Sequence, residues 1–363
     1  MKLAFSFLCE HPTRRTGLTT LFRAFIAEAR RQAPAVEWVI FAGAGAFSDL
    51  AGPGVEVVED FPANDRRSAR LWADHFRVGP EARRRGASAL LTVGFLPLRT
   101  GGLPVVMHVF SVHHRGGGGL GAAYRRAMVG RGLRRAALVI ANSQWTADQL
   151  DARVPVLVSH EGLDSAVFHP AGPAGIPSTP APYLLWTSNF YPYKRAERVL
   201  AAYARLSREL RARFPLVLAG GDWEGGRARA EAEARRLGIE ADTRFVGWVA
   251  DADLPALYRG ARALVAATAE ETFGRFVTEA LACGCPCVLQ DLPVLREVAG
   301  AAARFVDFAD PVAAGEALRE LCTDDALAAR LRAEGLERAK QFSYERLVRE
   351  RLTAILRLSQ LKP

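Results

Sequence analysis

The sequence lacks an apolar run of the roughly 18 residues that a membrane-spanning helix requires. Its first nine residues are mostly apolar, but Glu10, His11 and Pro12 follow at once. We therefore expect a first strand there and not a secretion signal. Only five cysteines occur in 363 residues, an odd number, and they lack the spacing of metal ligands in a loop. These absences favour reduced, buried thiols and a cytoplasmic protein.

Two glycine-rich segments fall short of complete nucleotide-binding motifs. Gly43 and Gly45 begin a dinucleotide fingerprint, but Ser48 stands where a third glycine is needed for close packing of the helix. Residues 116–119 are glycines without the Gly-Lys-Ser or Gly-Lys-Thr ending of a P-loop. We expect a turn at the first place and a mobile loop at the second. The half-fingerprint is the only support for an NAD-dependent oxidoreductase.

The sequence has 48 lysines and arginines against 39 aspartates and glutamates, a formal net charge of +9. Such an excess suits nucleic acid, an anionic membrane or an anionic substrate. The denser arginine clusters, at residues 66–77, 83–85 and 125–135, lack the interleaved aromatics and glycines of a nucleic-acid module. We expect no nucleic-acid partner. The clusters are either solvated helix faces or a peripheral contact with an anionic membrane at its inner face.

Short apolar runs of strand type alternate with helical patterns through the first half of the chain. The strand-like runs are at residues 3–8, 36–42, 55–58, 89–93, 105–110, 138–141 and 156–159. Such alternation predicts an α/β fold with a parallel, doubly wound sheet. Proline and glycine then dominate residues 171–182, which predicts a linker, and a strand-like run resumes at Tyr183. The chain is long enough for two domains with a core each.

Residues 266–288 carry the strongest signal of a site. Apolar runs at residues 263–267 and 286–290 are expected strands, so the segment between them crosses through a loop and a short helix. Gly274 opens the expected helix and Gly284 ends it. The free N–H groups and the dipole at the start of that helix would hold an anion at the strand ends.

Two carboxylates, Glu271 and Glu279, flank this group of amides. A carboxylate beside a phosphate repels it, unless the carboxylate accepts hydrogen bonds from hydroxyl groups on either side of the phosphate. Hexose, diphosphate and ribose have that order, so a nucleotide sugar fits better than free ATP. The structural alternative is that Glu271 caps the helix and Glu279 is a solvated helix residue.

The segment resembles the two-glutamate signature of the retaining family-4 glycosyltransferases. The matching residues are Glu271, Phe273, Gly274, Glu279, Ala280, Ala282, Gly284 and Pro286. The resemblance implies the GT-B fold, in which two Rossmann-like domains face a cleft. It also implies that Glu271 contacts the transferred sugar and Glu279 the ribose. Backbone amides would then hold the sugar and diphosphate, and they belong to Thr272, Phe273, Gly274 and Arg275.

The same resemblance divides the chain. It assigns residues 1–170 to an N-terminal Rossmann-like domain on the acceptor side, 171–182 to the linker and 183–342 to a Rossmann-like domain for the nucleotide-sugar donor. Residues 343–363 are amphipathic and basic, and in this architecture such a helix crosses back onto the first domain. A partner-binding helix is the alternative.

Lys194 and Arg195 lie at the start of an expected helix that runs through Arg213, so their charge opposes the helix dipole. A bound anion would explain them. In the family, a lysine at the place of Lys194 contacts the donor diphosphate, and an arginine five residues earlier joins it. This sequence has Asn189 at the arginine position. Either Asn189 or Arg195 is left to supply the second contact.

Three further donor-site residues follow from the resemblance. Family members have a glycine-bearing loop after the first strand, and Gly17 is the matching residue. The family's nucleobase lies against the backbone after a Gly-aromatic-Val turn. In this sequence the turn begins at Gly247, and Trp248 and Val249 are the predicted contacts.

A histidine after the fifth strand lies near the transferred sugar in the family. His108 is the candidate, although many relatives have this histidine two positions later. A buried structural histidine is the alternative for His108, and His113 or His114 could take its place.

The sequence therefore predicts a retaining glycosyltransferase of polysaccharide or glycoconjugate biosynthesis. It would move a hexose from a UDP- or GDP-sugar to a sugar, lipid-linked or small-molecule acceptor, with Glu271, Lys194 and His108 as its catalytic residues. The resemblance implies that no metal ion is required, because in the family cationic side chains and helix amides stabilise the leaving diphosphate. Asp251 and Asp253 have the spacing of metal ligands but lie at a helix start, where capping explains them.

Two other classes of function stay open at this point. A sugar-nucleotide epimerase or a phosphorylase of the same shape would act without a separate acceptor, or with inorganic phosphate. A non-catalytic partner protein that binds the nucleotide sugar would have the fold without turnover. Intact Lys194, Glu271 and Glu279 argue against that reading.

Overall fold

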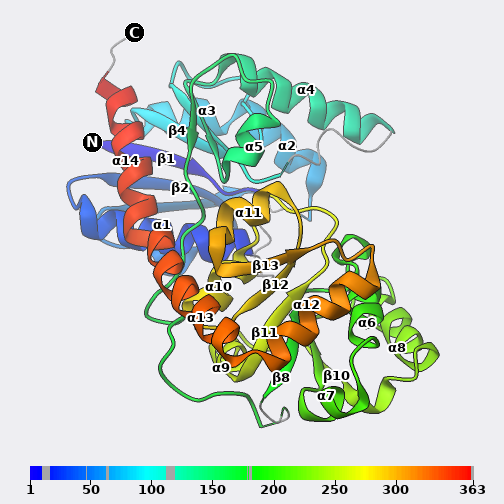
Figure 1. The fold of residues 1–363 in the computed structure, drawn as a ribbon. Helices are drawn as coiled ribbons and strands as arrows, with labels where there is room; N and C mark the ends of the chain where they lie inside the picture. Colours follow the sequence, from blue (N-terminus) through cyan, green and yellow to red (C-terminus); the bar gives the residue numbers. More distant parts are fainter. Residues whose placement is uncertain are drawn as a thin grey trace. The chain divides into compact units, whose positions relative to one another are not determined.

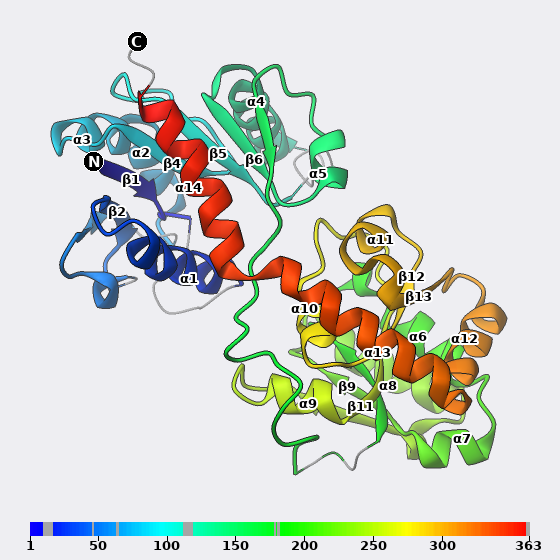
Figure 2. The ribbon, with the colours of Figure 1, turned by 60° about the vertical axis from the view of Figure 1, so that its left-hand side comes forward.

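The computed structural model describes residues 1–9, 17–45, 47–62, 65–111, 119–177, 179 and 182–360. These residues form two compact units (Figures 1 and 2). Unit 1 contains Met1–Gly162 and the C-terminal segment from Tyr344, and unit 2 contains Leu163–Ser343. The predicted domain limits at residues 170 and 182 stay predictions.

Unit 1 is built on a seven-stranded parallel sheet with the order β3-β2-β1-β4-β5-β6-β7. Its strands are β1 (Lys2–Ser6), β2 (Glu37–Gly43), β3 (Val55–Phe61), β4 (Ala89–Val93), β5 (Val105–Val109), β6 (Leu138–Ala141) and β7 (Val156–Val158). Each strand lies at one of the predicted apolar runs. The strand order reverses between β1 and β4, which is the switch point where doubly wound sheets bind ligands.

Helices cover both faces of this sheet. They are α1 (Gly17–Gln32), α2 (Arg67–Phe76), α3 (Val78–Arg84), α4 (Gly119–Arg135), α5 (Gln144–Asp148) and α14 (Tyr344–Gln360), with a 3₁₀ turn η1 (Ser48–Leu50). Alternate β1 side chains point to opposite faces, so Phe5 packs with α1 and α14, whereas Ala4 packs with α2, α3 and α4. The predicted doubly wound arrangement is confirmed.

The C-terminal helix α14 belongs to unit 1 and contacts α1 (Figure 2). Leu347, Val348, Leu352 and Ile355 form its buried stripe. Arg351 on the same helix is fully buried, and its Nη2 donates to the carbonyl oxygen of Ser159 at 3.0 Å. Burial lowers the pKa of Arg351 to about 10. The prediction that this helix returns to the first domain is confirmed.

Unit 2 is built on a six-stranded parallel sheet with the order β10-β9-β8-β11-β12-β13. Its strands are β8 (Tyr183–Thr187), β9 (Leu216–Ala219), β10 (Thr243–Gly247), β11 (Ala261–Ala266), β12 (Cys287–Gln290) and β13 (Ala303–Val306). Its helices are α6 (Ala196–Tyr203), α7 (Arg208–Arg213), α8 (Gly226–Arg236), α9 (Leu254–Gly260), α10 (Arg275–Ala282), α11 (Pro293–Ala299), α12 (Pro311–Thr323) and α13 (Asp325–Ala339). Its 3₁₀ turns are η3 (Pro192–Lys194), η4 (Glu240–Asp242), η5 (Gly300–Ala302) and η6 (Lys340–Phe342).

One expected helix of unit 2 is two helices. The sequence predicts a continuous helix to Arg213, but α6 ends at Tyr203 and α7 begins at Arg208. Ser207 between them has extended backbone, and its side chain accepts from the Leu210 N–H at 3.3 Å. Serine favours such a cap over a helix interior, because its hydroxyl competes for backbone groups.

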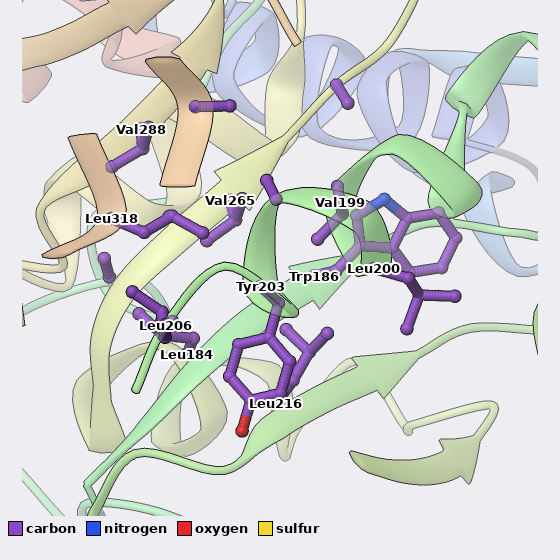
Figure 3. Close-up of a cluster of buried hydrophobic side chains, with 14 of the residues drawn as sticks. Leu184, Trp186, Val199, Leu200, Tyr203, Leu206, Leu216, Val265, Val288 and Leu318 are labelled. Atoms are coloured by element: carbon purple, nitrogen blue, oxygen red, sulfur yellow. The ribbon is translucent and has the colours of Figure 1, made fainter. Parts of the chain in front are cut away.

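A buried apolar cluster joins the sheet of unit 2 to α6 and α12 (Figure 3). Trp186 of β8, Leu216 of β9 and Leu318 of α12 are almost completely buried in it. Tyr203 brings its hydroxyl into the same region, where the carbonyl oxygens of Asp242, Phe214 and Arg211 lie within 3.1–3.3 Å and can accept its one proton. Burying one large apolar side chain stabilises a fold by about 1.5–3 kcal/mol. The cluster therefore supports the strand ends from which the loops of the site extend.

The five cysteines are all free thiols, and Cys9 is the only one that is not fully buried. Within the described part of the chain, none of the helices combines the length and the apolar character that crossing a membrane would need.

Candidate active site

The predicted crossing between β11 and β12 is present, and α10 (Arg275–Ala282) is its helix. Gly274 is the N-cap residue and has a φ of 92°, in the left-handed region that glycine adopts without strain. At the other end, Gly284 has a φ of 71°, and Cys285 N–H donates to the carbonyl oxygen of Ala280 at 2.9 Å. As predicted, Gly274 lies at the start of the helix and Gly284 follows its end.

Lys194 and Glu271 are in direct contact. Lys194 Nζ donates to Glu271 Oε1, and both side chains are only 13% exposed. The ammonium also lies 5.2 Å from the ring centroids of Tyr193 and Phe276. Such positions over aromatic faces attract a cation. Two residues that the sequence assigns separately to the diphosphate and to the sugar are therefore neighbours.

Backbone bonds hold the two loops of this pair together. Ala269 N–H donates to the carbonyl oxygen of Tyr193 at 2.7 Å, which joins the loop after β11 to the loop after β8. The Tyr193 ring is partly buried there, and burial together with the negative charge of Glu271 raises its pKa to about 12. The Tyr193 hydroxyl consequently stays protonated at neutral pH, and no second negative charge arises beside Glu271.

Glu279 is held from two sides on α10. Its Oε2 accepts from the Tyr258 hydroxyl at 3.1 Å, and its Oε1 lies 3.5 Å from an Arg275 guanidinium nitrogen. The side chain is only 12% exposed. Tyr258 is fully buried, and its hydroxyl lies 3.2 Å from the Thr187 hydroxyl. Burial first, and then the carboxylate of Glu279, raise the pKa of Tyr258 well above its usual value.

The structural alternatives for the two glutamates do not describe what is found. Glu271 is not the N-cap of α10, because Gly274 occupies that position. Glu279 is not a solvated helix residue, because most of its side chain is buried. Both carboxylates are instead held by a cation or a buried hydroxyl on a different segment of the chain.

Glycines let the neighbouring strand ends approach one another closely. Gly220 follows β9 with a φ of 156°, and a Cβ there would lie 1.6 Å from the carbonyl oxygen of Ser188 after β8. Its N–H donates to the carbonyl oxygen of Gly247 at 2.7 Å. The carboxyl ends of β8, β9 and β10 therefore meet at this edge of the sheet, as expected for a ligand site of an α/β fold.

Trp248 and Val249 continue from that edge after β10. The Trp248 side chain is 73% exposed, so its ring is available for stacking. Val249 is half-buried. Their contact with a nucleobase stays a prediction.

Asn189 and Arg195 have other partners in the structure. Asn189 Oδ1 accepts from the Gly221 N–H at 3.0 Å. Arg195 has a left-handed backbone with a φ of 53°, and its guanidinium lies 3.6 Å from Glu197. A non-glycine residue in that conformation costs roughly 1–2 kcal/mol. Both residues stay predictions for the second diphosphate contact.

His108 lies inside unit 1 and is completely buried. Its ring stacks on Phe5 and Phe110, and its Nδ1 is 3.3 Å from the carbonyl oxygen of Thr92. Burial, and then the charge of Arg351, lower its pKa well below the usual value, so the imidazole is neutral. This environment is that of the structural histidine which the sequence left open, and it offers no support for a catalytic role.

The remaining unit 1 predictions fall at the limits of the described residues. Gly17 is the first residue of α1, and the loop before it lies outside the described residues. The same is true of His113, His114 and the glycines at 116–118.

The sequence did not single out Tyr258, and its prediction that Asp253 caps a helix is only partly right. Tyr258 belongs to an ordinary amphipathic helix pattern. Only the contacts of its hydroxyl with Glu279 and Thr187, which are distant in sequence, distinguish it from a core tyrosine. Asp253 does occupy the N-cap of α9, but its side chain makes no capping hydrogen bond, which corrects the expectation. Among the described residues, no group of three His, Cys, Asp or Glu side chains is arranged to hold a metal ion.

Comparisons with known families and structures agree with this geometry. The family described as "Glycosyl transferases group 1" matches residues 175–338, and "Glycosyltransferase Family 4" matches residues 15–166. The D-inositol 3-phosphate glycosyltransferase 1 of Catenulispora acidiphila is 30% identical over 295 residues, which cover 73% of this chain and 69% of that protein. The O-antigen chain mannosyltransferase B of Escherichia coli is 35% identical over 173 residues, 47% of this chain and 45% of that protein.

Solved structures of similar fold cover nearly the whole chain. Sucrose-phosphate synthase from Thermosynechococcus elongatus has a TM-score of 0.79 at 18% identity and covers 98% of both chains. Anabaena HepE in complex with UDP and glucose has a TM-score of 0.74 at 17% identity, over 98% of this chain and 100% of the other.

The chain belongs to glycosyltransferase family 4, the glycosyl transferases group 1, and has the GT-B fold of two Rossmann-like domains. This is a family of retaining hexosyltransferases that use nucleotide-sugar donors. The chain spans about half the length of some curated relatives, 45% of one and 52% of another.

Proposed function

We propose that this protein transfers a hexose, with retention of configuration, from a UDP- or GDP-sugar to a carbohydrate or lipid-linked acceptor in glycoconjugate biosynthesis. The observation that carries the proposal is the contact between Lys194 and Glu271 beside the N-terminus of α10. A cation and a carboxylate side by side fit the two adjoining parts of a nucleotide sugar, the diphosphate and the hexose. The amides at the start of α10 add positive potential for the diphosphate.

Each group then has a distinct part in the transfer. Glu271 accepts hydrogen bonds from hydroxyls of the hexose and holds its anomeric carbon in place. The bond from that carbon to the diphosphate oxygen breaks while a bond to the acceptor oxygen forms on the same face. The acceptor proton passes to a phosphate oxygen. Lys194 and the α10 amides stabilise the additional negative charge that develops on the leaving oxygen of the diphosphate before the proton arrives.

The nucleoside binds at Glu279, one turn further along α10 than the amides that hold the diphosphate. Glu279 accepts hydrogen bonds from the ribose, and the Tyr258 hydroxyl keeps the carboxylate oriented. Trp248, exposed at the end of β10, stacks against the base. Because protein cations and amides supply the positive charge in this scheme, it assigns no step to a metal ion.

The names of relatives and of similar solved structures indicate which hexoses and bases to test first. They include a mannosyltransferase of Escherichia coli and a structure of HepE in complex with UDP-glucose. These names support a hexose and a nucleotide diphosphate donor for this chain as well. They leave the acceptor to be found by experiment.

Thermal melting with a panel of UDP-, GDP- and ADP-sugars tests the proposal directly. A donor at a hundred times its dissociation constant stabilises the folded protein by about 2.7 kcal/mol, and one base should stand out in the panel. Slow donor hydrolysis without acceptor should accompany that shift. If no sugar nucleotide shifts the melting temperature, the proposal is wrong. A product that is an isomeric sugar nucleotide, or a sugar phosphate formed only with inorganic phosphate, would indicate an epimerase or a phosphorylase.

A further inference from the structure

Unit 1 contains a cavity of about 460 Å³ between α2, α4 and the ends of two strands. Val93 to Phe95 lie at the end of β4, and Val109 to Ser111 lie at the end of β5. Cys9, shortly after β1, also lines it. The cavity is thus next to the switch point of the seven-stranded sheet, where α/β folds bind ligands. Its volume is within the range of small-molecule sites.

Most of the wall is apolar. Leu71 of α2, Phe95 and Phe110 after the strands, and Met128 of α4 form it. A bare sugar ring would need a hydrogen-bond partner for most of its hydroxyls, because an unpaired buried hydroxyl costs free energy. This wall offers few partners and suits a hydrocarbon segment better.

The polar part of the lining is cationic. The described residues that line the cavity include Arg70 and Arg125 and no aspartate or glutamate. Arg70 is largely buried, with 13% of its side chain exposed, and its Nε has no hydrogen-bond partner. Arg125 makes no hydrogen bond or ion pair with any other residue that the structure describes. Both arginines can therefore donate to an anion in the cavity.

An acidic group lies behind Arg70, whereas Arg125 has no acidic partner among the described residues. Arg70 Nη1 donates to Asp74 Oδ2 at 3.0 Å, and Asp74 also accepts from the Ser6 hydroxyl at 2.8 Å. Burial raises the pKa of Asp74 to about 6 in spite of these two bonds. His75 lies beside it, and burial together with the charges of Arg70 and Arg131 lowers its pKa, which keeps this ring neutral at pH 7. The cavity keeps an excess of positive charge.

The two helices of the cavity are tied to each other and expose further apolar side chains. His75 Nε2 of α2 and the Tyr124 hydroxyl of α4 are hydrogen-bonded. Trp72 and Phe76 on α2 and Leu120 on α4 are exposed large apolar residues, and the Trp72 side chain is 58% exposed. Both helices therefore carry exposed apolar side chains in addition to those that line the cavity.

We propose that this cavity binds the phosphate group and the adjoining hydrocarbon segment of an amphiphilic acceptor. Arg70 and Arg125 bind the phosphate, and the wall of Leu71, Phe95, Phe110 and Met128 holds the hydrocarbon. Only the identification of this ligand as the acceptor rests on the proposed glycosyl transfer. The binding of a lipid phosphate does not.

Calorimetric titration without donor tests the site with three probes: geranyl phosphate, inorganic phosphate and geraniol. Geranyl phosphate is short enough to stay monomeric and carries both parts of the proposed ligand. It should bind at least ten-fold more tightly than either fragment. Arg125→Gln should weaken it about ten-fold, because one charge-assisted hydrogen bond is lost. Arg134→Gln is the matched control, since Arg134 is an exposed arginine of the same helix that does not line the cavity.

Several outcomes would overturn the proposal. Equal binding of geraniol would remove the role of the arginines, and equal binding of inorganic phosphate would remove the role of the apolar wall. An equal loss in Arg125→Gln and Arg134→Gln would indicate general attraction to a basic surface and not this site. If geranyl phosphate binds as expected while no sugar nucleotide does, the site stands and the glycosyl transfer fails.

Discussion

Lys194 and Glu271 form an ion pair across 77 positions of the chain. In the proposed function, the donor diphosphate binds the ammonium of Lys194, and the donor hexose binds the carboxylate of Glu271. The pair must therefore loosen as the donor binds, and each residue affects what the other contributes to affinity. Mutation of one partner should be measured on nucleotide binding and on transfer separately.

Lys194→Met removes the cation and keeps much of the side-chain volume between Tyr193 and Phe276. Affinity for the nucleoside diphosphate should fall roughly 10- to 100-fold, the value of a hydrogen bond to a charged group. Calorimetric titration with UDP and GDP measures it. Lys340→Met, at an exposed lysine of the same unit, serves as the control. Unchanged nucleotide affinity in Lys194→Met would remove the diphosphate assignment.

Glu271→Gln keeps the shape of the side chain and removes its charge. Turnover should fall by more than ten-fold, because the contact positions the anomeric carbon as the leaving bond lengthens. Affinity for the bare nucleoside diphosphate should stay the same or rise, since Lys194 is released from its partner. Steady-state kinetics and titration of the same preparation separate the two effects. Full transfer by this variant with several donors would end the assignment of Glu271 to the sugar.

Tyr258→Phe removes the hydroxyl that orients Glu279. If Glu279 binds the ribose, Tyr258→Phe and Glu279→Gln should each weaken sugar nucleotide and bare nucleoside diphosphate by a similar factor. Loss of the hydrogen bond should also lower the free energy of unfolding by about 1 kcal/mol. Tyr203→Phe is the matched control, because that buried hydroxyl bonds to backbone carbonyls in the core of the same unit. Equal donor affinity in both variants would reduce Tyr258 to a structural role.

His108 should contribute a loss of stability on mild acidification. Its pKa is lowered in the folded protein, so below pH 6.5 the unfolded chain binds a proton that the native state does not. Stability from this group is complete above the unfolded pKa and falls as pH decreases, by about 1 kcal/mol between pH 6.5 and 5.5. Urea unfolding of the wild type and of His108→Leu at the two pH values should show a smaller decrease in the variant. Asp74, whose raised pKa has the opposite effect, is common to both proteins.

The same variant decides between the two readings of His108. A buried structural histidine predicts that His108→Leu keeps its specific transfer rate wherever it is folded. Loss of turnover without loss of stability would restore the catalytic assignment.

The arginines of α2 and its surroundings give a prediction about membranes. Arg67 and the aromatic Trp72 are both exposed on α2. A peripheral contact with an anionic surface is worth roughly 1 kcal/mol per cation near it. Sedimentation with phosphatidylglycerol vesicles should show binding that declines with salt and is weaker in Arg67→Gln than in Arg208→Gln, an exposed arginine of unit 2. If vesicles do not bind the protein at low salt, these arginines are a solvated helix face.

Local sequence was sufficient for the elements of the site. Apolar runs located β11 and β12, and the glycines at 274 and 284 located both ends of α10. These signals are local, since a left-handed residue at a helix end depends on the backbone of a few neighbours. The glutamates could be singled out for the same reason, as their distance along one loop and helix is set by the chain itself.

Tertiary structure decided which residues meet. The contact of Lys194 with Glu271, the hydroxyl of Tyr258 on Glu279 and the burial of His108 among phenylalanines all join segments distant in sequence. Apolar periodicity shows which face of an element is buried but not which partner covers it. For that reason the sequence by itself determined the fold class and the loop that carries the glutamates. Only packing decided that His108 is buried and that a basic, apolar cavity lies between α2 and α4.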